Sequence, residues 1–329
     1  MPQLSHAYAC ARISALSTTL LDASTVRRMA DGTYAEAVRV LADLRYGGLS
    51  DTTEVDTERI IEAELNEAMR EIKELTPEPV WTDMFLLRTD IQNLKVLLKA
   101  RCLGKKEDVW SYGGLYSREQ LSAMVADRKY KVLPKPIFEA LNGLERSLSQ
   151  NVDPQRISIS LDRAYLTHCM ETSKKHPVFS QYFKALADFD NVLTFLRMRA
   201  MGAPKHQLDE MLLPEGGIRW KSFLDAYELS NESLNRILFE SVCKDALLEG
   251  LNAMLRTGNL AELERARANY TLSFFTERRY EVESIYPILG YYFAKEREGR
   301  AVRLILTAKR NGLGESVIRE RLVTLYGER

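Results

Sequence analysis

The chain has 329 residues, of which 45% are hydrophobic and 28% are charged. This composition is typical of a soluble globular protein with about two or three domains. The 46 basic residues balance the 46 acidic residues, so the chain lacks the basic excess that favours nucleic acid or anionic lipid, and we expect no nucleic-acid partner. Glycine (17) and proline (10) are sparse, which favours long helices over a turn-rich β fold.

The sequence has no pattern for a disulfide framework, a signal peptide or a membrane anchor. Its four cysteines are far apart, as free thiols in a reducing compartment are; they are Cys10, Cys102, Cys169 and Cys243. The amino terminus lacks the basic start and apolar core of a signal peptide. No apolar run reaches the roughly 20 residues that cross a bilayer. We therefore expect a cytoplasmic chain with no direct membrane insertion.

Apolar residues recur at three- and four-residue steps through most of the chain, and the alternation typical of strands is weak. The pattern predicts an all-α fold. In chain order, helices are expected over 5–21, from about 26, over 34–44, 57–75, 81–101, 137–148, 155–173, after Pro177, over 231–255, 260–276, after Pro287 and over 315–326.

One helical pattern occurs three times, over residues 90–104, 188–202 and 298–312. The second copy follows the first by 98 residues (188 − 90 = 98), and the third follows the second by 110 (298 − 188 = 110). Each copy has an acid, a small residue three places later, a base eleven places after the acid, and a closing glycine. These positions are Asp90, Asn93, Arg101 and Gly104, then Asp188, Asn191, Arg199 and Gly202, then Glu298, Ala301, Lys309 and Gly312. They fall in one stripe of a helix.

The simplest interpretation of these positions is structural. An acid in the first turn and a base in the last turn complement the helix dipole, and glycine just past the end is a common C-cap. We expect the three copies at equivalent places in three similar helical units, residues 1–108, 109–208 and 209–329. Shorter matches support this division, such as 113–115 with 216–218, where the glycine pairs are expected to be turns.

The sequence contains no motif for catalysis, nucleotide binding or metal binding. The histidines are scattered and form no ligand pair; they are His6, His168, His176 and His206. Asp188 with Asp190, or Asp90 with Asn93, suggests a Mg²⁺ site of the kind found in helical isoprenoid enzymes. That chemistry requires several carboxylates in one cavity, and the repeat positions do not supply them. We expect no cofactor, no metal and no enzymatic activity.

The three copies, in this order and spacing, resemble the C subunit of the V-type (A/V-type) ATP synthase and ATPase, a family also called the d or AC39 subunit. The resemblance covers residues 8–326 and includes the opening of the third unit, residues 213–218. It is strongest in the third copy, through Pro287, Leu289, Tyr291, Tyr292, Lys295, Glu296, Glu298, Arg303, Ile305, Leu306, Lys309, Asn311, Gly312 and Leu313. The sequence departs from the family pattern at Ala301, where asparagine is more usual.

The resemblance implies three similar helical units arranged with pseudo-three-fold symmetry as a funnel or cup. It also implies a non-catalytic central-stalk subunit on the cytoplasmic face of a membrane. Such a subunit links the axle, subunits D and F, to the rotor ring of proteolipid subunits. In this way it couples ATP hydrolysis or synthesis to transport of H⁺ or Na⁺.

Two other classes of protein fit parts of the pattern. A free-standing helical-repeat scaffold or adaptor also contains helical repeats, although its repeats usually have about 34–47 residues. A helical lyase or synthase ranks third, because it would need the carboxylate cluster that the repeat positions do not supply.

Overall fold

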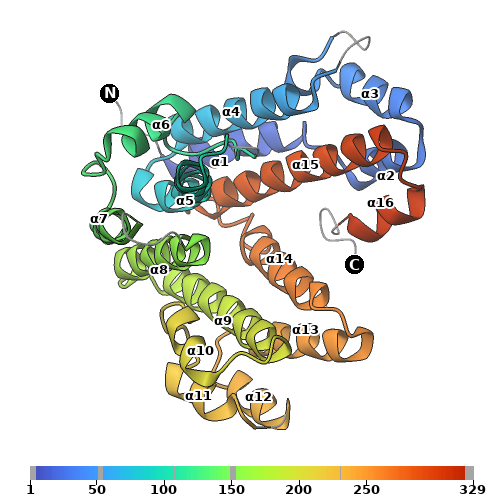
Figure 1. Cartoon of the computed structure of the whole chain (residues 1–329). Helices are drawn as coiled ribbons and strands as arrows, with labels where there is room; N and C mark the ends of the chain where they lie inside the picture. The colour runs from blue at the N-terminus through green and yellow to red at the C-terminus, as the bar shows by residue number, and fades with distance from the viewer. Residues whose placement is uncertain (1–4, 51–54, 107–108, 149–152, 230, 323–329) are drawn as a thin grey trace. The chain divides into compact units, whose positions relative to one another are not determined.

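The computed structural model describes residues 5–50, 55–106, 109–148, 153–229 and 231–322. Within these ranges it contains sixteen α-helices, one short 3₁₀ helix and no strand (Figure 1). The predicted all-α class is therefore confirmed. Over the same ranges, no helix combines the length and the apolar character of a bilayer span.

The elements have the bounds α1 (His6–Ser17), α2 (Ala23–Asp31), α3 (Tyr34–Asp43), η1 (Tyr46–Gly48), α4 (Thr57–Leu75), α5 (Pro79–Leu103), α6 (Arg118–Asp127), α7 (Lys135–Leu148), α8 (Pro154–Ser173), α9 (Pro177–Ala200), α10 (Lys205–Met211), α11 (Trp220–Ala226), α12 (Asn231–Leu238), α13 (Lys244–Thr257), α14 (Ala261–Thr276), α15 (Tyr286–Arg310) and α16 (Glu315–Arg321).

Many helix starts follow short polar side chains in the sequence. Side chains at these N-cap positions accept a hydrogen bond from a backbone N–H of the first turn, among them Asp22, Thr33, Asp56, Ser117 and Asp153. Such a cap stabilises a helix by about 1 kcal/mol, because those N–H groups have no partner inside the helix. Local sequence therefore fixes where these helices begin.

The helix expected over 231–255 is interrupted in the structure, where α12 and α13 are separated by residues 239–243. Ser241 lies in this break and is buried. Its Oγ donates to Asp188 Oδ2 at 2.5 Å and accepts from the Cys243 N–H at 3.2 Å. A buried carboxylate needs donors, so a tertiary bond explains a break that helical periodicity does not predict.

The last helix is shorter than predicted, since Leu322, just after α16, has an extended backbone. The expected helix over 315–326 begins at Glu315 and ends at Arg321 as α16. Residues 323–326 lie outside the described ranges.

The chain divides into two compact units. The first contains residues 1–89, 111–115 and 272–329, and the second contains residues 90–110 and 116–271, so the division falls inside α5 and α14. This division by contacts differs from the three consecutive segments expected from the sequence. Those segments were inferred from sequence similarity, and their equivalence stays a prediction.

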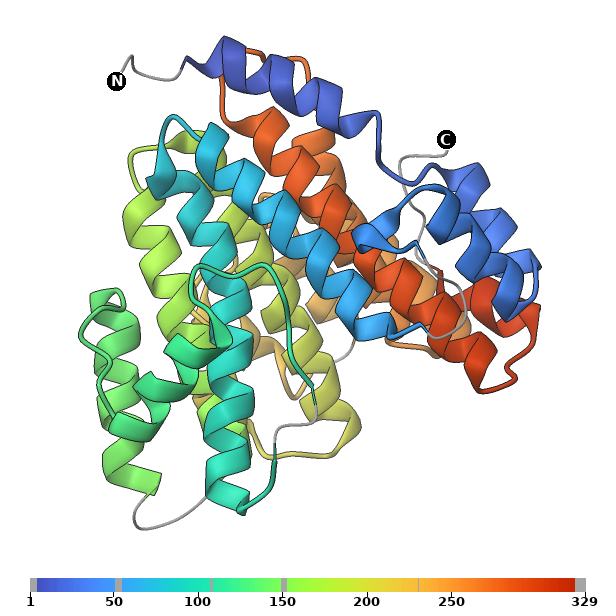
Figure 2. The same ribbon diagram turned by 90° about the horizontal axis from the view of Figure 1, so that it is seen from above.

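The first unit brings the two ends of the chain together. Helix α15 packs along α4, and α1, α2 and α3 also contact α15; Figure 2 shows α4 and α15 side by side. Buried apolar side chains of α2, α3, α4 and α15 form one cluster, which includes Met29, Leu41, Ile61, Val302 and Ile305. Burial of each side chain of this size stabilises the folded state by roughly 1.5–3 kcal/mol.

The second unit is built on α8 and α9. Helix α7 packs on α8, α8 packs on α9, and α10 to α13 follow as a chain of neighbouring helices. Its core cluster joins α9 to α10–α14 and includes Phe189, Phe195, Phe223 and Leu247. Runs of adjacent aromatic residues are buried in both units, namely Tyr182 with Phe183, Phe274 with Phe275, and Tyr291 to Phe293.

A mostly buried ion pair joins α5 to α15 in the first unit. The Arg88 guanidinium is bound to the Glu296 carboxylate, and Arg300 lies 3.6 Å from the same carboxylate. The Tyr292 hydroxyl lies 3.1 Å from Glu296 Oε1. Burial alone would raise the pKa of Glu296, but the charges of Arg88 and Arg300 outweigh burial and lower it. The ionised form of Glu296 therefore stabilises the fold.

We predict that Glu296→Gln flattens the acid limb of the stability profile. Because the folded pKa lies below the unfolded value, the stabilisation is present above the unfolded pKa and is lost as the pH falls through the folded pKa. At pH 7 the free energy of unfolding of the variant should be lower by on the order of 3 kcal/mol, since Arg88 is left without its carboxylate. Urea unfolding followed by circular dichroism between pH 3 and pH 7 measures both effects.

Glu62→Gln is the matched control, because Glu62 is exposed on α4 and the substitution removes the same charge. An equal slope of unfolding free energy against pH in the wild type and Glu296→Gln would contradict the stabilising role of the ionised carboxylate.

Candidate functional site

The three copies of the repeated pattern lie on the three long helices α5, α9 and α15. Their closing glycines all have positive φ, at 60° for Gly104, 65° for Gly202 and 69° for Gly312. Each glycine N–H donates to the carbonyl of the base three residues earlier, and the following N–H donates to a carbonyl five residues earlier. This is the Schellman arrangement, which glycine adopts without strain. The predicted C-caps are confirmed and are alike in all three helices.

The sequence predicted the three acids in the first turns of their helices, and the structure has them further along. Asp90 comes eleven residues after the first residue of α5 (90 − 79 = 11), and Asp188 eleven after that of α9 (188 − 177 = 11). Glu298 comes twelve after the first residue of α15 (298 − 286 = 12). The expected role in the first turn, as a complement to the helix dipole, was therefore wrong. All three acids are in mid-helix and at most 1% exposed.

Each acid accepts a hydrogen bond from the backbone at the start of a short helix. The donor is in every case the residue immediately before the N-cap residue, which is Ser117 for α6, Arg219 for α11 and Asp22 for α2. The bonds are Tyr116 N to Asp90 Oδ1 at 3.4 Å, Ile218 N to Asp188 Oδ1 at 3.0 Å, and Leu21 N to Glu298 Oε2 at 2.6 Å.

Each base donates to backbone carbonyls at the other end of the same short helix. Carbonyls at a helix C-terminus have no intrahelical partner, and a cation there is favourable. The bonds are Arg101 Nη1 to Val125 O at 2.7 Å for α6, Arg199 Nη2 to Leu229 O at 2.9 Å just beyond α11, and Lys309 Nζ to Ala30 O at 2.7 Å and to Gly32 O for α2. We call each such acid and base pair, acting on both ends of one short helix, a clamp.

The third clamp differs from the others in the span of chain that it closes. The acids of α5 and α9 bind segments 26 and 30 residues away. The acid of α15 binds Leu21, which is 277 residues away, near the other end of the chain. The clamp of α15 on α2 therefore fastens the end of the chain to its beginning, inside the first unit.

The residue three places after each acid is polar or apolar according to the groups that surround it. Asn191 is fully buried, accepts from the Leu213 N–H at 2.7 Å and donates to the Leu213 carbonyl at 3.3 Å. Asn93 is buried as well. Ala301 lies instead in the apolar cluster that contains Leu21, so an asparagine there would lie among apolar side chains.

The clamp of α9 explains a glycine pair that the sequence assigned to a turn. The Gly217 N–H donates to both Asp188 oxygens at 3.0 Å. A Cβ on Gly216 would lie 2.3 Å from Asp188 Oδ1, and one on Gly217 would lie 2.8 Å from the Glu240 carbonyl oxygen. The loop backbone thus passes over the carboxylate too closely for any side chain.

Burial and hydrogen bonding act in opposite directions on the charged groups of the clamps. Burial raises the pKa of Asp188, and hydrogen bonds from Ser241, Ile218 and Gly217 oppose that rise. Burial also raises the pKa of Glu298, against the charge of Lys295, whose Nζ lies 2.8 Å from Glu298 Oε1.

Lys295 is a buried charged residue that contacts the clamp of α15 but is not part of the repeated pattern. It is 2% exposed and also binds the Glu64 carboxylate of α4. Burial alone would lower the pKa of Lys295, but the Glu298 and Glu64 carboxylates raise it. The sequence contains an indication that Lys295 is buried, because it follows Ile288, Tyr291 and Tyr292 at helical steps on an otherwise apolar stripe.

The described ranges contain no group of three histidine, cysteine, aspartate or glutamate side chains that could hold a metal ion. Asp190, which a Mg²⁺ site would combine with Asp188, forms an ion pair with Arg267 at 2.8 Å instead. The structure thus brings the repeat positions together as backbone-binding pairs that fasten helices.

We predict that Asp188→Asn destabilises the protein by about 1–3 kcal/mol, because an amide replaces one acceptor by a donor that faces other donors. Thermal or urea unfolding measures the change. Asp209→Asn is the matched control, since Asp209 is an exposed aspartate of the same unit. If the two substitutions lower the free energy of unfolding equally little, the Asp188 carboxylate does not stabilise the fold.

Comparison with known proteins extends over nearly the whole chain. A family model described as "ATP synthase (C/AC39) subunit" matches residues 9–321. The chain is 24% identical to the C subunit of the A-type ATP synthase of Methanosarcina acetivorans over an alignment of 345 residues, which covers 97% of this chain and 93% of that protein. It is 25% identical to the C subunit of the V-type ATP synthase of Thermus thermophilus over 357 residues, covering 96% and 98%. It is 23% identical to the C subunit of the V-type sodium ATPase of Enterococcus hirae over 279 residues, covering 84% of each.

Proposed function

Because the chain belongs to the ATP synthase (C/AC39) subunit family, we propose that it is the non-catalytic central-stalk subunit of a rotary ATPase or ATP synthase. In this role it links the axle, subunits D and F, to the rotor ring of proteolipid subunits. It lies on the cytoplasmic face of the membrane, held by the complex and without inserting into lipid. It couples ATP hydrolysis or synthesis to the transport of H⁺ or Na⁺.

The match along residues 9–321 carries this proposal, and the clamps support it physically. A stalk subunit transmits torque, so it requires elements that do not slide on one another. In each clamp, a long helix binds a short helix at both ends through charged side chains and backbone groups. Bonds at two points oppose both translation and rotation of the short helix.

The clamps also support three equivalent units, residues 1–108, 109–208 and 209–329, arranged with pseudo-three-fold symmetry as a funnel or cup. The same acid and base act on the same two ends of a short helix in each copy. The third copy acts on α2, at the start of the chain. A repeat whose last member binds the first is what a closed arrangement requires, whereas an open array leaves its terminal units unpaired.

We predict that omission of the chain uncouples the complex. The soluble head should continue to hydrolyse ATP, while ATP-driven ion pumping should stop, because the axle is no longer connected to the rotor ring. Reconstitution of head and membrane sector in vesicles, with and without the chain, measures both activities in the same preparation. Addition of the purified chain to the depleted complex should restore pumping. Pumping that stays coupled to hydrolysis without the chain would refute the stalk assignment.

A further inference from the structure

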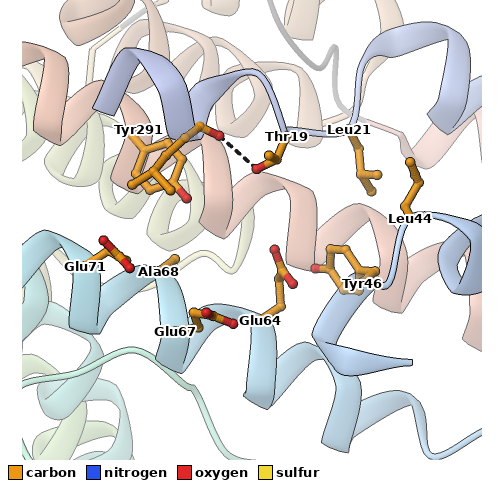
Figure 3. Close-up of a pocket in the computed structure, with 10 residues that line it drawn as sticks. Thr19, Leu21, Leu44, Tyr46, Glu64, Glu67, Ala68, Glu71 and Tyr291 are labelled. Atoms are coloured by element: carbon orange, nitrogen blue, oxygen red, sulfur yellow. Dashed lines mark hydrogen bonds between the residues drawn. The ribbon is translucent and has the colours of Figure 1, made fainter. Parts of the chain in front are cut away.

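The first unit contains a cavity of about 200 Å³ that the clamps do not use. It lies beside α4, and residues from the end of α1, from the segment before α2, from η1 and from α15 complete its lining (Figure 3). It is smaller than the roughly 300–1,000 Å³ of sites for drug-sized ligands, so it suits a small or thin molecule.

The lining is acidic on one side. Glu64, Glu67 and Glu71 of α4 face the cavity at steps of three and four residues, and no lining residue is basic. Glu64 is bound to Lys295 and accepts from the Gly47 N–H at 2.8 Å. Glu67 has an exposed partner, Arg70, at 3.4 Å, and Glu71 lies 4.0 Å from the half-exposed Arg12. Lys295 also pairs with Glu298, so these four carboxylates share three basic partners.

A second feature points to a ligand. Tyr46 is 4% exposed, and its hydroxyl has no hydrogen-bond partner within the described residues. Figure 3 shows this hydroxyl directed across the cavity toward Glu64. Burial, with the charges of Glu298 and Glu64, raises the pKa of Tyr46, so the hydroxyl stays protonated and can accept a hydrogen bond from an N–H group. A buried hydroxyl is rarely left unpaired.

The geometry favours an elongated cation over a single metal ion. Glu64 and Glu71 are seven residues apart, which is about 10 Å along a helix. The described ranges contain no group of three or more histidine, cysteine, aspartate or glutamate side chains that could hold a metal ion. The lining also contains the apolar side chains Leu16, Leu21, Leu44 and Ala68; Figure 3 shows Leu21 and Leu44 near Tyr46, and Ala68 between Glu64 and Glu71. Such a wall suits methylene groups.

We propose that this cavity binds a linear alkyl diammonium or polyammonium ion, the chemistry of the polyamines. One ammonium group lies beside Glu64 and the Tyr46 hydroxyl, the other lies beside Glu71 and Tyr291, and the methylene chain between them passes Ala68. The lining reaches the clamp of α15 through two residues, since Leu21 is bound to Glu298 and Glu64 is bound to Lys295. Occupancy therefore stabilises the closure of the chain's two ends in the first unit.

Isothermal titration calorimetry of the full chain with spermidine and putrescine tests the proposal, with propylamine and MgCl₂ at equal ionic strength as comparison ligands. The expected result is saturable binding of spermidine and putrescine, and binding at least about tenfold weaker for propylamine and Mg²⁺. Glu71→Gln and Tyr46→Phe should each weaken spermidine binding about tenfold, the change expected on loss of one hydrogen bond to a charged group. Glu62→Gln, on the exposed side of α4, should leave it unchanged.

Circular dichroism and unfolding temperature establish that each variant is folded, and Tyr46→Phe alone suffices if Glu71→Gln does not fold. Absence of saturable spermidine binding by the folded wild type would overturn the proposal. So would equal affinity for Mg²⁺ and spermidine, or equal loss of binding in Glu62→Gln and Glu71→Gln, because either result would indicate a non-specific charge effect.

Discussion

The hydrogen bonds between buried carboxylates and distant backbone N–H groups are the interactions on which this fold depends. An ionised carboxylate in mid-helix is costly to bury unless donors reach it. Here the donors are backbone groups at the start of another helix, such as Leu21 for Glu298 and Ile218 for Asp188. Each acid therefore holds the start of the short helix against the long helix, and the base eleven residues later holds its other end.

Helix α15 shows how far this constraint extends. It binds α2 through Glu298 and Lys309, α4 through Lys295, and α5 through Glu296. Each of these bonds links segments more than two hundred residues apart in sequence. Much of the first unit's order therefore rests on charged groups of one helix.

The sequence predicted what depends on local chemistry. Helical periodicity and the glycines after the long helices were both readable from neighbouring residues. The mid-helix position of the acids was missed, although Pro177 and Pro287 mark helix starts well before them. The break at Ser241 and the bond of Glu298 to Leu21 depend on partners 53 and 277 residues away. No local pattern contains that information.

Native-state amide hydrogen exchange of Lys309→Met, compared with the wild type, tests most directly whether a clamp fastens its short helix. The substitution removes the cation at the C-terminus of α2 and leaves the bases of α5 and α9 unchanged. Exchange over residues 23–31 should accelerate about tenfold, as expected on loss of a hydrogen bond from a charged group, while exchange over residues 220–226 should stay as in the wild type. Unchanged exchange over residues 23–31, or equal acceleration in both helices, would contradict the clamp.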